Sequence, residues 1–242
     1  MTASPQQRRT NDDDLVAAIE DATGYLTAGI SMIAAPGWRA PAAQPALSNI
    51  SIGVEKLAKV TIGQMLETDT GAFPGGKGLK RFGHRIDELT SVLGDMVETR
   101  ASRLGKAYVL DLKHTLNADP YWPILIEALD IAADAERGRY VHEVRLGGGT
   151  PKGPSVQEVW ARLDEMAVAD LGVLADLSGS GSGEALVRVR HRAVMPVVQW
   201  WNLMVRTWQH GVAGPRARTF SSEVALAWSY LPDDLCEFAR SL

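Results

Sequence analysis

Residues 119–149, DPYWPILIEALDIAADAERGRYVHEVRLGGG, form the stretch that decides the predicted fold. Its first half repeats apolar residues at the spacing of an α-helix. Its second half is a dense run of charged and aromatic residues that stops at three glycines. Asp119 and Pro120 suit the first positions of a helix, and glycine suits the position just after its end. We therefore predict one helix from Asp119 to the residue before Gly147, with the polar run on its last turns.

The rest of the chain shows the same helical period. Apolar residues recur every three or four positions, β-branched residues do not cluster, and no long stretch alternates with the period of two that marks a β-strand. This pattern predicts an all-α bundle of about seven helices. The predicted helices cover residues 14–35, 46–68, 80–97, 119–146, 155–174, 184–210 and 221–230, and a softer stretch at 102–117 can hold a short helix.

Glycine, proline and capping residues place the breaks between these helices. Glycine-rich residues 71–78 predict a loop, and the letters LSGSGSG at 177–183 predict a flexible linker. Ser155 and Glu158 have the spacing of a capping box, which predicts a helix start. Pro196 predicts a kink inside the helix at 184–210.

The same breaks between helices suggest the domain organisation. Polar residues 1–10 predict a disordered N-terminal tail, and residues 11–176 hold the main helical bundle. Residues 184–242 are expected to form a C-terminal helical extension packed on that bundle. We expect a single domain overall, because the C-terminal piece is short.

Composition excludes several classes of protein. The 242 residues carry a formal net charge of −4, so nucleic-acid contact has to come from a local patch instead of an overall basic field. The single cysteine, Cys236, excludes an intrachain disulfide framework and a cysteine-based zinc site. Neither a signal peptide nor an apolar run long enough for a membrane span is present. We expect a cytoplasmic protein without membrane contact, metal or cofactor.

The polar run within 119–149 holds the best candidate for catalysis. Arg137 and His142 are separated by four residues. Cleavage of RNA without a metal needs a base for the 2′-OH proton and a cation beside the phosphate. An imidazole can exchange protons near neutral pH, and a guanidinium is permanently charged and forked. Arg137 and His142 are therefore a candidate catalytic pair.

Helix geometry complicates this interpretation. Positions five apart diverge by roughly 140° on an ideal helix, so the two side chains would point in different directions. Either Gly138 distorts the helix, or the two groups meet across a dimer interface. The alternative interpretation is a solvated face, on which the arginines pair with acidic neighbours and His142 caps the helix end. The residues that would pair are Arg137, Arg139 and Arg145 with Asp134, Glu136 and Glu143.

Three stretches together resemble the HEPN superfamily of all-helical proteins. They are LSNISIGVEKLAK at 47–59, RFGHRIDEL at 81–89, and the Arg-x4-His pair later in the chain, so the resemblance covers residues 14–146. It implies that the first two stretches are scaffold and that Arg137 and His142 form the active site of a metal-independent ribonuclease. It also implies a homodimer that acts as a toxin or a phage-defence effector, with an antitoxin or another protein partner. The chain departs from the family pattern at Gly138, where a polar residue is usual.

Further basic and aromatic residues are expected to support RNA binding. Tyr140 lies three positions after Arg137 and can stack on a base or contact a phosphate. The full set of expected supporting residues is Arg139, Tyr140, Arg145, Lys80, Arg81 and His84.

A second cluster mixes basic residues with tryptophans near the C-terminus. Such interleaving is typical of surfaces that bind single-stranded nucleic acid, but tryptophans on a helix rich in Val, Met and Leu are more often core or interface residues. The alternative function is therefore a catalytically inactive interaction or scaffold protein that uses the Trp-rich C-terminal helices. The cluster comprises Arg188, Arg190, His191, Arg192, Trp200, Trp201, Arg206, Trp208 and His210.

Overall fold

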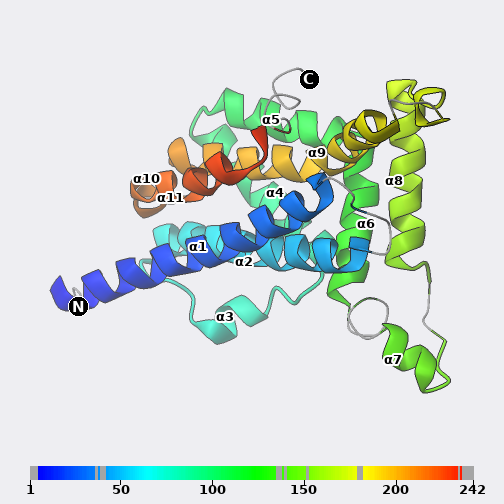
Figure 1. Ribbon diagram of the computed structural model, residues 1–242. Coiled ribbons are helices and arrows are strands. Elements are labelled where there is room, and N and C mark those ends of the chain that lie inside the picture. Colours follow the sequence, from blue (N-terminus) through cyan, green and yellow to red (C-terminus); the bar gives the residue numbers. More distant parts are fainter. Residues whose placement is uncertain are drawn as a thin grey trace.

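The computed structural model describes residues 5–35, 38, 42–134, 138, 141–150, 153–178, 182–233 and 235, and it describes side chains from residue 11 onward. Every regular element within these residues is a helix, as Figure 1 shows. The predicted all-α fold is confirmed.

Seven long helices build the bundle, and shorter helices connect them. The long helices are α1 (Pro5–Ala34), α2 (Ala43–Thr70), α4 (Ile86–Arg103), α5 (Ala107–Ala118), α6 (Tyr121–Ala133), α8 (Val156–Leu171) and α9 (Ser182–Gln209). The short α-helices in the described residues are α3 (Gly76–Lys80), α7 (Val141–Leu146), α10 (Pro215–Thr219) and α11 (Ser221–Leu226). Two 3₁₀ turns, Asp176–Ser178 and Ala227–Tyr230, complete the architecture.

Two glycines bring α1 and α2 into backbone contact. An added Cβ on Gly29 would lie 2.6 Å from the carbonyl oxygen of Ala46, and one on Gly53 would lie 2.8 Å from that of Ala22. Both distances are shorter than real Cβ contacts. Because Gly29 meets the start of α2 and Gly53 meets the middle of α1, the two helices run antiparallel (Figure 1).

The core is continuous from α1 to the C-terminal helices. α9 packs against α1, α5, α6 and α8, and Trp200, Trp201 and Trp208 on it are buried. The indole N–H of Trp201 donates to the carbonyl oxygen of Val224 at 3.0 Å, and that of Trp208 donates to the Thr61 hydroxyl at 2.9 Å. The expectation that these tryptophans are core residues is therefore confirmed. These three side chains are therefore not available to a partner protein in this fold, and an interaction through the C-terminal helices would have to use other residues.

The basic residues that precede these tryptophans do not form one surface either. Arg190 and His191 are buried. The guanidinium of Arg192 lies 3.7 Å from the ring centroid of Tyr121, and it binds Asp119 at 3.2 Å and Asp170 at 3.0 Å. This arginine therefore fastens the start of α6 to α8 and α9. Burial raises the pKa of Tyr121 to about 12.

Several predicted helix ends differ in the structure. α1 begins at Pro5 rather than near Asp14, so the predicted tail is helical from Pro5 on. Proline suits a first helical position. The predicted loop at 71–78 contains the start of α3, and Lys80 ends that helix instead of opening the next. Gly83 then takes a φ of +65°, and α4 starts only at Ile86. The softer stretch at 102–117 contains α5.

Later boundaries follow the local signals more closely. The capping box at Ser155 and Glu158 is confirmed, and α8 ends at Leu171 because Gly172 adopts a left-handed conformation. Part of the predicted linker at 177–183 belongs to a 3₁₀ turn and to the start of α9. α9 continues through Pro196. The last predicted helix, 221–230, is α11 followed by a 3₁₀ turn, and α10 was not predicted.

We predict opposite effects for alanine at two glycines of the α1–α2 pair. Gly53→Ala forces the helices apart and should lower the free energy of unfolding by about 2 kcal/mol, the usual cost of overpacking. Gly24 on α1 has open space where a Cβ would stand. Gly24→Ala should therefore raise stability by about 0.5–1 kcal/mol through helix propensity. Urea unfolding followed by circular dichroism measures both, and equal effects at the two positions would contradict the close-packing argument.

We also predict a pH-dependent effect at Asp164 on α8. Burial raises its pKa to about 6, although the nearby charge of Arg190 acts in the opposite direction. The folded state then binds more protons than the unfolded state between about pH 4 and 6, so stability falls as the pH rises through this window. Asp164→Asn, which is always neutral, should be more stable than the wild type at pH 8 by about 1–2 kcal/mol. The difference should shrink toward pH 4 in urea unfolding curves, whereas a constant difference would contradict the assignment.

Candidate active site

Side chains of α2 bind the C-terminal end of α6. Ser51 donates its hydroxyl to the carbonyl oxygen of Leu129 at 3.1 Å. Ser48 and Gln44 donate to the carbonyl oxygen of Ala132 at 3.5 and 3.4 Å. The last four carbonyls of a helix have no partner within the helix, so Ser48 and Gln44 satisfy the Ala132 carbonyl, whereas Ser51 adds a second donor to the Leu129 carbonyl, one position before those four. The donors lie at i, i+4 and i+7 of α2, which places them on one face.

The loop before α4 meets the same region. The carboxylate of Asp130 on α6 accepts the backbone N–H of Ile86 at 2.9 Å, so α6 caps the start of α4. His84 in this loop lies with Nδ1 2.8 Å from Oε1 of Glu55 on α2, and Lys59 binds the same carboxylate at 2.7 Å. These contacts attach the Gly83–His84 turn to α2.

The two stretches expected to be scaffold therefore converge where α6 ends. Residues 47–59 supply Ser48, Ser51 and Glu55, and residues 81–89 supply His84 and the N–H of Ile86. The chain enters the candidate catalytic segment directly after this junction. These two stretches are far from α6 in sequence, and tertiary structure brings both to its C-terminal end.

The predicted single helix from Asp119 to Leu146 is interrupted. α6 ends at Ala133, because the backbone of Asp134 turns to an extended conformation with a ψ of 138°. The next α-helix among the described residues is the separate α7, which begins at Val141. The prediction that the polar run lies on the last turns of the same helix is wrong. The hydrogen bonds from α2 and the capping of α4 by Asp130 explain why α6 stops here instead of continuing.

Gly138 lies in this interruption and packs closely on the end of α6. It is buried and has π-helical backbone geometry. Its N–H donates to the carbonyl oxygen of Asp134 at 3.2 Å. A Cβ at this position would lie 2.2 Å from the carbonyl oxygen of Ile131. Only glycine fits here, which gives a physical reason for the departure from the family pattern.

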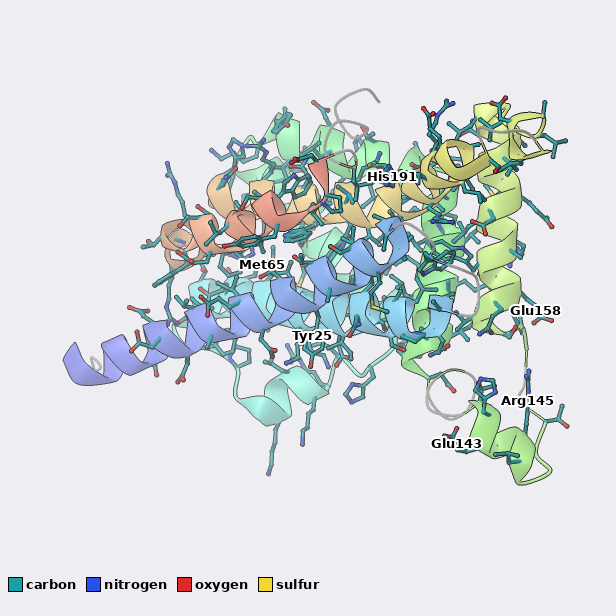
Figure 2. All side chains as sticks on the ribbon, in the orientation of Figure 1. Tyr25, Met65, Glu143, Arg145, Glu158 and His191 are labelled. Carbon is teal, nitrogen blue, oxygen red and sulfur yellow. The ribbon has the colours of Figure 1, made fainter. Side chains whose placement is uncertain are left out.

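The structure describes only some of the predicted catalytic and supporting residues. Arg137, Arg139 and Tyr140 lie outside the described residues. His142 and Arg145 are exposed on α7, which projects from the bundle and buries only Val141 (Figures 1 and 2). Among the residues predicted for catalysis and for its support, His142 and Arg145 thus share one short helix.

Arg145 lies near the N-terminal end of α8. Figure 2 labels it on α7 together with Glu158 at the start of α8. Hydrogen bonds from the backbone and hydroxyl of Ser155, with a smaller contribution from the charge of Arg145, hold the pKa of Glu158 below its usual range. The side chain of Arg145 is exposed, so its charge faces solvent beside His142.

The basic residues around α3 lie elsewhere. Lys80 and Arg81 are exposed, and the Arg81 guanidinium lies 4.8 Å from the ring centroid of Phe82. The side chain of His84 is 81% exposed and is bound to Glu55. α3 and α7 project from the same side of the bundle but are well separated along it (Figure 1). The structure therefore gives no single patch that holds all six expected supporting residues.

Sequence reasoning missed the residues that shape the junction. Ser48, Ser51 and Asp130 lie within predicted helices but were given no role, and Gln44 lies before the predicted helix at 46–68. Their one signal was the spacing of Gln44, Ser48 and Ser51 along α2, which puts three donors on one helix face. Nothing in the sequence identifies their acceptors, because the carbonyls of α6 lie about 80 residues away.

The described residues hold neither a cluster suited to a metal ion nor a membrane-spanning helix. No three His, Cys, Asp or Glu side chains gather there in a way that could hold a metal ion. None of the described helices has the length and hydropathy needed to cross a membrane.

Comparison with known proteins neither supports nor contradicts the predicted family. No protein-family model, curated protein or solved structure matches this chain. The resemblance to the HEPN superfamily thus stays a prediction from the three motifs.

We predict that alanine at Gly138 disrupts the junction. Gly138→Ala places a methyl group against the carbonyls of α6 and should lower the free energy of unfolding by about 1–3 kcal/mol. Gly147, just after α7, is the matched control, because a Cβ there makes only ordinary contacts at 3.5 Å. Gly147→Ala should change stability by less than about 0.5 kcal/mol. Thermal unfolding measures both, and a neutral Gly138→Ala would contradict the close packing.

Proposed function

We propose that this protein is a metal-independent endoribonuclease of the HEPN type, which acts as a homodimer and serves as a toxin-like or phage-defence effector. Arg137 and His142 are its catalytic residues. The observation that carries the proposal is the junction at the end of α6. There, hydrogen bonds join residues 47–59 and 81–89 to the helix that precedes the Arg-x4-His segment.

The interruption between α6 and α7 also supports the proposal. On a continuous helix the two catalytic side chains would diverge by roughly 140°. α6 ends at Ala133 and His142 lies on the separate helix α7, so the single continuous helix that would impose this divergence is not present. His142 is exposed and is not needed for the core. A substrate as large as RNA requires that kind of access.

The proposed reaction is a transesterification within the RNA. His142 takes the proton of the 2′-OH, and the 2′ oxygen attacks the adjacent phosphorus. The bond from phosphorus to the 5′ oxygen breaks, and that oxygen takes up a proton from a second acid, which in a homodimer is His142 of the other protomer. Arg137 offsets the negative charge that grows on the phosphate oxygens. The products are a 2′,3′-cyclic phosphate and a 5′-hydroxyl.

The catalytic assignment predicts the outcome of a cleavage assay in EDTA. Purified wild type should cleave single-stranded RNA, and both Arg137→Ala and His142→Ala should lower the rate by at least about 100-fold, as loss of a general base or of charge stabilisation does. The matched controls are Arg103→Ala and His114→Ala, which change exposed residues on other helices. Both controls should cleave RNA at the wild-type rate.

Two outcomes would overturn the proposed function. One is intact RNA after incubation with the folded wild type. The other is equal loss of cleavage in the controls and in the catalytic variants. Product analysis adds an independent readout, because a 3′-phosphate and 5′-hydroxyl pattern without a cyclic intermediate would contradict the proposed attack by the 2′ oxygen.

A further inference from the structure

A cavity of about 900 Å³ lies at the end of the bundle where α1 begins, far from α7 (Figure 1). Its walls come from α1, α2, the loop after α2, and α10 with the residue that follows it. Close packing at two glycines builds these walls. Gly63 leaves room for the ring of Phe73, since a Cβ would lie 2.3 Å from that ring, and Gly214 leaves room for Thr68.

The single cation in the cavity wall is already neutralised. Arg216 on α10 binds Asp12 on α1 at 2.8 Å and Glu67 on α2 at 3.1 Å. It also donates to the backbone carbonyl of Asn11 at 2.7 Å. This network ties the three helices together. Because two carboxylates already share one guanidinium, the network leaves no positive charge for an anionic ligand.

Acceptors in the same wall remain without donors. Gln64 is 1% exposed, its Nε2 donates to Glu67 at 3.0 Å, and its amide oxygen has no hydrogen-bond partner. A buried amide oxygen without a donor is unfavourable, so it marks a place where a donor would stabilise the protein. Asp14 on α1 is exposed, lines the cavity, and forms no hydrogen bond or ion pair within the described residues.

Charge and shape together define the ligand. The charged residues of the wall are Asp12, Asp14, Glu67 and Arg216, so its formal charge is −2. Phe73, which is 38% exposed, and Phe220 add aromatic surface that attracts cations. We propose that this cavity binds a small organic ammonium ion with an apolar body. The ammonium group lies among Asp14, Glu67 and Gln64, and the apolar body lies against Phe73.

Three probes of similar shape test this site: the phenethylammonium ion, neutral 2-phenylethanol and anionic 3-phenylpropionate. Isothermal titration at low salt should show saturable binding of the ammonium ion, with at least fivefold weaker binding of the alcohol and none of the carboxylate. Asp14→Asn should weaken ammonium binding about three- to fivefold, as loss of one partly exposed ion pair does. Gln64→Met, which keeps the side-chain size but removes the acceptor, should weaken it by a similar factor.

The neighbouring Asp13 gives a matched control, because it is exposed on α1 but does not line the cavity. Asp13→Asn should bind the ammonium ion like the wild type. Tighter binding of the carboxylate, equal binding of the alcohol, or no saturable binding of phenethylammonium would each overturn the proposal. Equal effects of Asp13→Asn and Asp14→Asn would also do so, since they would indicate diffuse charge attraction. The proposal is independent of the ribonuclease assignment, which is tested on other residues.

Discussion

The backbone contact between α1 and α2 is the constraint on which the rest of the bundle depends. Gly29 and Gly53 let the antiparallel helices α1 and α2 approach until each glycine meets a carbonyl oxygen of the other helix. This approach fixes which face of α2 is left for the other elements. The opposite side of α2 then packs against α4 and α6. The positions of the junction at α6 and of the cavity at α10 both follow from that arrangement.

The junction at α6 shows how polar side chains can end a helix in a packed core. Ser48, Ser51 and Gln44 supply donors to its last carbonyls, and Asp130 supplies an acceptor to the start of α4. The contacts at Ala132 and Ile86 satisfy backbone groups that the helices themselves cannot satisfy. The stretches 47–59 and 81–89, which resemble HEPN proteins, thus hold the C-terminal end of α6 in place. The proposed catalytic segment follows α6 in the sequence.

The bundle places its two proposed sites at opposite ends. The open cavity beside Arg216 is lined by α1, α2 and α10 and is acidic, whereas α7 is exposed and carries both Arg145 and His142. Such a separation suits independent roles, because no described ion pair or hydrogen bond links the two ends.

The sequence by itself determined the helical class, most helix positions and the capping box at Ser155, because helical period and caps are local properties. Residue type also favoured core or interface positions for Trp201 and Trp208. Periodicity could not place the end of α6, since Ala133, Asp134 and their neighbours continue the helical pattern in sequence. Only tertiary structure decided that end, because the donors on α2 are distant in the chain. The Arg216 network could not be predicted for the same reason. Its guanidinium binds Glu67 and Asp12, which lie about 150 and 200 positions away in the sequence.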